Sequence, residues 1–124
     1  MQIVTARLVI AFASVIMTFG SGLWLSKIGR PLNTLLFTFH KLISLVTAVF
    51  LILGFIQLLK SIPMDARLSM LIAGAGAALA LTLASGGVLS FDKFAHTWLI
   101  RSHLLLTILC ILLAGLSLYY VTVN

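Results

Sequence analysis

Residues 42–59 read LISLVTAVFLILGFIQLL and contain no charged side chain. The rest of the chain has three more charge-free, mostly apolar runs, over residues 8–26, 68–91 and 102–124. A transmembrane helix needs about 20 predominantly apolar residues, and backbone groups in lipid must be hydrogen-bonded within the segment or in a closed barrel. The four runs therefore predict four membrane-spanning helices, over about residues 5–26, 31–59, 66–90 and 93–121.

The composition excludes a soluble globular domain. Of the 124 residues, 62% are apolar and 8% are charged, whereas an average globular chain has about 25% charged residues. So little polar surface cannot cover a small soluble core, and so apolar a chain is not disordered. The net charge is +6, but the eight basic side chains lie singly near the ends of the apolar runs. Because they form no basic stripe, we predict a lipid bilayer as the environment and no nucleic acid as a partner.

The connections between the four runs are short, at residues 27–31, 60–67 and 90–93. Short connections join neighbouring antiparallel helices, so the predicted fold is an all-α, integral membrane, up-down-up-down four-helix bundle. It forms a single domain of residues 1–124. Pro31 suits the first position of the second helix, and Asp92 suits the N-cap of the fourth. The first run exceeds the ~7–15 apolar residues of a signal peptide, so we expect it to be a retained helix.

The basic residues predict the orientation of the chain in the membrane. Five of them lie in or near the first and third connections, and three lie toward the face with both termini. Cytoplasmic segments carry an excess of lysine and arginine, so we expect these two connections in the cytoplasm and the termini outside. The membrane is expected to be a bacterial or archaeal cytoplasmic membrane. The first set is Lys27, Arg30, Lys41, Lys93 and Arg101, and the second is Arg7, Lys60 and Arg67.

Small and polar residues recur every seven positions within each predicted helix. Residues seven apart share a helix face, with a drift of about 20° per heptad. Polar groups are costly against lipid, so these stripes are expected to point inward. The serine, threonine, alanine and cysteine members are interpreted as packing residues, because membrane helix interfaces are rich in small side chains. The stripes are Arg7-Ser14-Ser21, Asn33-His40-Thr47-Gly54, Ala66-Ala73-Ala80-Gly87 and His96-His103-Cys110-Ser117.

Two intramembrane histidines are harder to explain by packing alone. His40 is predicted nine residues into the second helix and His103 ten residues into the fourth, about 13–15 Å from the same membrane face at ~1.5 Å per residue. The second and fourth helices of an up-down bundle are diagonal partners, so the two imidazoles should lie level across the core. Such a pair can supply both axial ligands of a haem iron. The alternative is two unrelated hydrogen bonds between helices.

Four glycines lie in the same half of the membrane as the two histidines. Gly20 and Gly22 lie near the end of the first predicted helix, and Gly86 and Gly87 near the end of the third. Without side chains, these positions leave room for the edge of a flat macrocycle. The alternative is that the glycines mark fraying or a cap at the helix ends.

Level histidines in the second and fourth helices, with glycines in the first and third, resemble the haem-binding four-helix core of the membrane b-type cytochromes. The resemblance implies one haem b per chain, with His40 and His103 as its iron ligands. It also implies electron transfer with a quinone, a small oxidant or a redox protein. Two-haem members of that group carry two histidines on each ligand helix, whereas the second helix here carries only His40. One bis-histidine haem is therefore the limit.

Two further polar residues lie one heptad nearer the cytoplasmic connections. Asn33 precedes His40 by seven positions and His96 precedes His103 by seven. Both are candidates to hydrogen-bond the haem propionates. For His96 the favoured alternative is a solvated side chain at the membrane interface, because it lies only a turn inside the fourth predicted helix.

Several other functions find less support in the sequence. Residues 74–80 read GAGAALA, but no strand precedes them, so they do not form a dinucleotide-binding loop. Four-helix multidrug transporters of similar length resemble this layout but rely on a membrane-embedded glutamate, and this chain has no glutamate. No catalytic set of serine or cysteine with histidine can be assembled from the sequence. An oxidoreductase activity stays possible, because it would depend on the predicted haem. A redox-inert transporter or an assembly subunit is the alternative to a cytochrome, and a homo-oligomer is a further partner prediction.

Overall fold

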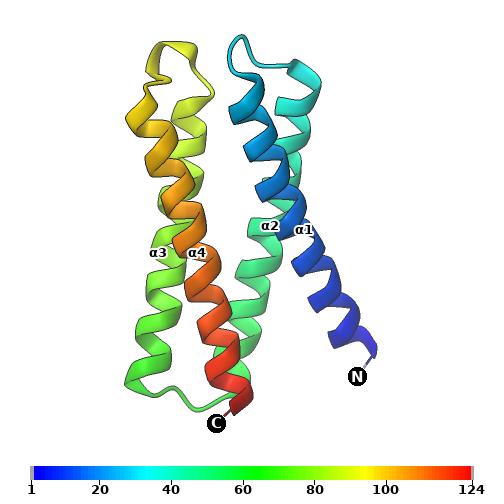
Figure 1. Cartoon of the computed structure of the whole chain (residues 1–124). Helices are drawn as coiled ribbons and strands as arrows, with labels where there is room; N and C mark the ends of the chain where they lie inside the picture. Colours follow the sequence, from blue (N-terminus) through cyan, green and yellow to red (C-terminus); the bar gives the residue numbers. More distant parts are fainter. Residues whose placement is uncertain (1, 124) are drawn as a thin grey trace. The chain divides into compact units, whose positions relative to one another are not determined.

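The computed structural model describes residues 2–123, with the side chains of residues 2–6 and 8 outside the described part. It contains α1 (Gln2–Ile28), α2 (Thr34–Ser61), α3 (Ala66–Leu89), the short 3₁₀ helix η1 (Asp92–Phe94) and α4 (Thr97–Val123) (Figure 1). Each of the four α-helices contains a segment long and apolar enough to cross a membrane. The all-α fold is confirmed, and the helices are those of an integral membrane protein.

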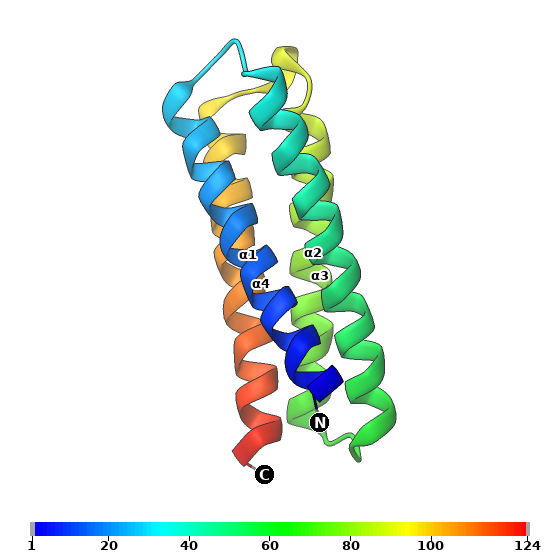
Figure 2. The same cartoon turned by 90° about the vertical axis from the view of Figure 1, so that its right-hand side faces the viewer.

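The chain divides between Lys60 and Ser61 into two compact units, and each is a helical hairpin. In the first, α1 and α2 run antiparallel and are joined by residues 29–33 (Figures 1 and 2). In the second, α3 and α4 run antiparallel and are joined by residues 90–96, which include η1. The up-down arrangement of all four helices in one bundle stays a prediction.

The end of α1 and the start of α2 are fixed by two local signals. Gly29 has a φ of 74°, and its N–H donates to the carbonyl of Leu25 at 3.1 Å. This left-handed residue just past the helix is the usual glycine C-cap, where a side chain would be strained. Asn33 caps α2, because its Oδ1 accepts from the N–H of Leu36 at 3.0 Å. Helix α2 therefore begins at Thr34, and the expectation that Pro31 would be its first residue is wrong.

The start of α4 also differs from the expectation. Asp92 was predicted to be its N-cap, but Asp92 instead opens η1 and accepts at its carbonyl from the N–H of Ala95 at 3.3 Å. Helix α4 begins at Thr97, and the carbonyl of His96 accepts from Leu99 and Ile100 at 3.0 and 3.1 Å. His40 is consequently the seventh residue of α2, and His103 is the seventh residue of α4. Each histidine therefore lies about 9 Å from the N-terminal end of its helix, whereas the predicted distance is about 13–15 Å.

The second hairpin packs closely through small side chains. Leu68, Ala75 and Ala78 of α3 are buried, and Ala75 is completely buried. Cys110, Ala114 and Ser117 of α4 are buried. Of the predicted α4 stripe, Cys110 and Ser117 are therefore buried and His103 is half-buried, whereas His96 is exposed. Small residues let the two backbones approach closely, so packing contacts extend along both helices.

The predicted stripe of α3 has the wrong register. Ala66, Ala73, Ala80 and Gly87 are all exposed, and the α3 face on α4 carries Leu68, Ala75 and Ala78 instead. Helix α3 is rich in small residues all round, so a seven-residue series of alanines does not by itself identify the packed face. The predicted stripes of α1 and α2 are buried only in part: Ser14, Ser21 and Thr47 are buried and His40 is half-buried, whereas Arg7, Asn33 and Gly54 are exposed.

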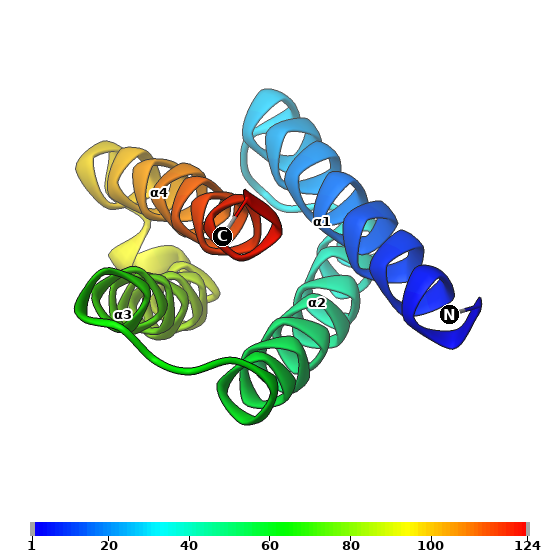
Figure 3. The same ribbon diagram turned by 90° about the horizontal axis from the view of Figure 1, so that it is seen from below.

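The first hairpin is more open than the second. Helices α1 and α2 lie side by side near residues 29–33 and diverge toward their other ends (Figures 1 and 3). Side-chain hydrogen bonds between the described residues join them at two places. One links Thr18 and Thr47, whose hydroxyl oxygens are 2.9 Å apart, and the other links Ser21 and His40. The hydrogen bonds therefore hold the helices together in the half of the hairpin that contains His40.

Candidate functional site

In the first hairpin, His40 is held between a hydroxyl group and a glycine of the neighbouring helix. Its Nδ1 lies 2.9 Å from Oγ of Ser21 on α1. A Cβ atom added at Gly22 would lie 3.0 Å from Cε1 of the same ring, so only glycine allows the imidazole to pack this closely against α1. The ring is half-buried, and Ser21 is buried.

The second hairpin holds His103 in the same way. Nδ1 of His103 lies 2.8 Å from Oγ of Ser85 on α3. A Cβ atom added at Gly86 would lie 3.1 Å from Cε1 of this ring. The imidazole of His103 is also half-buried. Each hairpin therefore presents one imidazole, bonded at Nδ1 to a serine and packed at Cε1 against the glycine that follows it.

The backbone contacts around each pair repeat as well. The Ser21 hydroxyl donates to the Thr18 carbonyl at 3.0 Å, and the Ser85 hydroxyl donates to the Thr82 carbonyl at 3.0 Å. Four residues after each histidine, another hydroxyl donates to the histidine carbonyl. These hydroxyls belong to Ser44, at 2.6 Å from the oxygen of His40, and to Thr107, at 2.8 Å from the oxygen of His103.

A short sequence signal for this repeat exists, but it is absent from the predicted seven-residue stripes. Residues 18–22 and 82–86 share the pattern Thr-x-x-Ser-Gly, and residues 40–44 and 103–107 share His followed four positions later by Ser or Thr. The serine and histidine are 19 residues apart in the first hairpin and 18 in the second. Because the two spacings differ by one, a search for a constant repeat length passes over the match.

The other four site residues predicted from the sequence are all exposed. Gly20 and Gly87 are exposed, and a Cβ atom at either position would meet nothing within 4 Å. Asn33 is exposed and uses its side-chain oxygen to cap α2. His96 is exposed at the start of α4, in agreement with a solvated interfacial side chain. The glycine prediction thus separates into Gly22 and Gly86, which contact an imidazole, and two that do not.

The two hairpins differ one or two turns beyond the histidines. In the first, Thr47 also donates to the carbonyl of Ile43 at 2.8 Å while its oxygen contacts Thr18. In the second, Cys110 occupies the corresponding place seven residues after His103, and its Sγ lies 3.8 Å from the carbonyl of Ala75. The repeat therefore ends before Thr47 and Cys110, which make different contacts.

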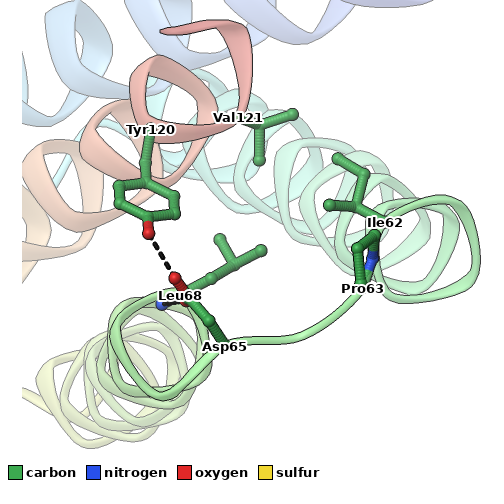
Figure 4. Close-up of a pocket in the computed structure, with 6 residues that line it drawn as sticks. All are labelled: Ile62, Pro63, Asp65, Leu68, Tyr120 and Val121. Carbon is green, nitrogen blue, oxygen red and sulfur yellow. Dashed lines mark hydrogen bonds between the residues drawn. The ribbon is translucent and has the colours of Figure 1, made fainter. Parts of the chain in front are cut away.

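A second polar contact lies at the opposite end of the α3–α4 hairpin. The Tyr120 hydroxyl donates to Oδ2 of Asp65, and Oδ1 of Asp65 accepts from the N–H of Leu68 at 2.7 Å (Figure 4). These bonds hold the pKa of the Asp65 carboxyl below its ordinary value of 3.8. An adjoining pocket of about 150 Å³ is lined by Ile62, Pro63, Asp65, Leu68, Tyr120 and Val121. Typical ligand sites span about 300–1,000 Å³, so we assign no ligand to it.

Among residues 2–123, no group of three or more histidine, cysteine, aspartate or glutamate side chains is arranged to hold a metal ion. A haem iron needs only two protein ligands, which two separate histidines can provide. Comparisons with protein-family models, with curated proteins and with solved structures found no match. The functional assignment therefore depends on the chemistry of the chain's own residues.

Proposed function

We propose that this protein is a membrane b-type cytochrome that binds one haem through His40 and His103. The observation that carries the proposal is the repeated unit, in which each hairpin holds one imidazole by a serine at Nδ1 and a glycine at Cε1. The match in serine, glycine and histidine supports one shared role for the two imidazoles over two unrelated contacts between helices. Two equivalent imidazoles are what a bis-histidine haem requires.

The residues fit the group that the proposal invokes. Histidines that bind a metal through one ring nitrogen usually hydrogen-bond through the other, which fixes the orientation of the ring. Ser21 and Ser85 provide that contact at Nδ1 of His40 and His103, which leaves Nε2 as the ligating atom. When bound, a haem with two histidine ligands exchanges single electrons between ferric and ferrous iron.

The position of the histidines favours exchange of electrons at one membrane face. Each histidine is the seventh residue of its helix, near the end that carries Asn33 or His96. Both are exposed there. Asn33 is the proposed hydrogen-bonding partner of a haem propionate, and His96 is proposed to be a solvated side chain at the membrane interface. The proposed electron partner at this face is a quinone, a small oxidant or a redox protein.

One observation favours the alternative of a redox-inert transporter or assembly subunit. No buried side-chain nitrogen or oxygen among the described side chains lacks a hydrogen-bond partner. The Ser–His contacts then serve only to join neighbouring helices, as polar side chains do in many membrane proteins. Binding of haem distinguishes this alternative from the cytochrome.

The test is a titration of the detergent-purified chain with hemin, followed by absorbance. Wild-type protein should bind near one hemin per chain with a low-spin spectrum, and His40→Ala and His103→Ala should each abolish that spectrum. The matched control is His96→Ala, which removes an exposed histidine and should leave the spectrum largely intact. Loss of the spectrum in the His96 variant alone would contradict the assignment.

A further inference from the structure

The two serines have a fixed number of hydrogens to share. A serine hydroxyl carries one hydrogen and two acceptor lone pairs, and a backbone carbonyl can only accept. Oγ of Ser21 lies 3.0 Å from the carbonyl oxygen of Thr18 and 2.9 Å from Nδ1 of His40. If the hydroxyl hydrogen is donated to Thr18, the contact with His40 is a hydrogen bond only when Nδ1 carries a hydrogen.

The same count applies to the second hairpin. Oγ of Ser85 lies 3.0 Å from the carbonyl oxygen of Thr82 and 2.8 Å from Nδ1 of His103. Both contacts are satisfied together only when Ser85 donates to Thr82 and Nδ1 of His103 donates to Ser85. A neutral imidazole has one N–H, so Nε2 of each ring then carries no hydrogen and presents a lone pair.

We propose that Ser21 and Ser85 are positioning residues that set the tautomer of His40 and His103, each serine acting as a hydrogen-bond acceptor anchored on a threonine carbonyl. Both imidazoles are thereby held in the Nδ1–H form before any cofactor arrives. As a preparation for haem binding, this inference rests on the proposed function, but the tautomer itself is a property of the chain alone. Metal-ligating histidines are oriented by such partners, and removal of a partner typically costs ~10–100-fold in metal affinity.

Neighbouring hydroxyl groups provide a matched control. Ser44 is the same residue type and touches the same histidine, but its hydroxyl donates to the His40 carbonyl and not to the ring. Ser44→Ala therefore removes a hydroxyl next to His40 without changing the partner of Nδ1. Ser21→Ala removes that partner and leaves Nδ1 with no serine oxygen to donate to.

The direct test uses nitrogen-15 NMR of the full chain, labelled at histidine and free of haem, at a pH well above the ordinary histidine pKa of about 6.5. The nitrogen shifts distinguish a protonated ring nitrogen from an unprotonated one, and the signals are assigned with the His40→Ala and His103→Ala chains. We expect protonated Nδ1 and unprotonated Nε2 for both histidines. Protonated Nε2 at either ring would overturn the assignment of its serine.

Variants then connect the tautomer to the serines. Ser21→Ala should weaken the Nδ1–H preference at His40, and Ser85→Ala should weaken it at His103, where the Thr82 carbonyl also interacts with the imidazole. Ser44→Ala should leave the preference at His40 unchanged. If the preference is undiminished after the serine substitutions, it comes from another group, and the role assigned to the serines is wrong.

Hemin binding separates this inference from the proposed function. We expect the affinity for hemin to fall ~10–100-fold in the double Ser21→Ala, Ser85→Ala chain. A wild-type chain with Nδ1–H histidines that binds no hemin would overturn the cytochrome and leave the tautomer assignment intact. A chain that binds hemin but has Nε2–H histidines in its haem-free form would overturn the tautomer assignment and leave the cytochrome proposal intact.

Discussion

Gly22 and Gly86 give each imidazole its place against the neighbouring helix. A Cβ atom would lie 3.0 Å from Cε1 of His40 in one hairpin and 3.1 Å from Cε1 of His103 in the other. At such distances the imidazole would have to shift by a few tenths of an ångström. Such a shift would disturb the Ser–His hydrogen bonds of 2.9 and 2.8 Å. Glycine is therefore part of the unit that orients the histidine.

Gly22→Ala and Gly86→Ala should each weaken hemin binding. Overpacking a close contact costs about 1–3 kcal/mol. The lower end of that range, about 1 kcal/mol, corresponds to an affinity about fivefold lower. The measurement is the hemin titration of each variant chain.

The other two glycines give the matched controls for this prediction. Gly20→Ala and Gly87→Ala place a methyl group where no atom lies within 4 Å, so they should bind hemin like the wild type. Equal losses in all four variants, or none in any, would contradict the role of Gly22 and Gly86.

The sequence predicts some residues of the candidate site well and others poorly. His40 and His103 are prominent because an ionisable residue inside a membrane helix is rare and costly. Ser21 and Ser85 are not prominent in the sequence, because serine is an ordinary packing residue in membrane helices. Only the packing of two helices brings the serine Oγ close to the histidine Nδ1. Ser85 also lies off the predicted stripe of α3, whose register is wrong.

Helices α3 and α4 pack through small buried side chains, and their interface has little space for larger ones. Ala75 of α3 and Ser117 of α4 are both completely buried. The sequence predicts the existence and approximate extent of both helices because long charge-free runs leave few alternatives. The sequence does not predict where α2 and α4 begin, because the Asn33 side chain caps α2 and the His96 carbonyl accepts the first hydrogen bonds of α4, and no apolar pattern reveals such contacts.

Ala75→Leu should destabilise the α3–α4 hairpin by about 1–3 kcal/mol, since three additional carbon atoms have no space in this interface. The measurement is unfolding of the purified protein in detergent, followed by circular dichroism. Ala80→Leu is the matched control, because Ala80 is exposed on α3 and a larger side chain there should change stability little. A larger loss for Ala80→Leu than for Ala75→Leu would contradict the packing of the hairpin.

The Asp65–Tyr120 hydrogen bond ties the start of α3 to the last turns of α4. Because the pKa of Asp65 is lowered below 3.8, chiefly by this bond, its contribution to stability is present above that pH. It is lost as the pH falls through the lowered value, since protonation removes the charged acceptor. Acid unfolding of the wild type should therefore show a loss of stability below about pH 4 that reflects this carboxyl.

Tyr120→Phe should remove most of that loss, because phenylalanine cannot donate to Asp65. Unfolding of both chains from pH 7 to pH 3 measures the difference. An unchanged acid profile in Tyr120→Phe would show that the hydrogen bond does not link the two helices.

The complete chain combines two hairpins, each with one histidine unit, and a charge distribution that predicts its orientation. Five basic residues lie in or near residues 27–30, 41, 93 and 101, and three lie toward the other face, at positions 7, 60 and 67. Because positive residues favour the cytoplasm, residues 29–33 and 90–96 are predicted to lie there. The proposed haem then exchanges electrons on the cytoplasmic side.

Topology reporters test this orientation. Alkaline phosphatase, which is active only outside the cytoplasm, should be active when fused within residues 62–65 and inactive when fused within residues 90–96. A green fluorescent protein at the same positions should give the opposite pattern. Reversal of both patterns would move the histidine-bearing end of each hairpin to the outer face.

The central claim is that His40 and His103 together hold one haem, and a dithionite-reduced minus oxidised absorbance spectrum tests it most directly. The chain is expressed with a supply of haem, purified in detergent and measured together with its haem content. We predict sharp low-spin cytochrome bands at near one haem per chain. A colourless protein that also fails to take up added hemin would contradict the claim and leave the Ser–His pairs as hydrogen bonds that join helices.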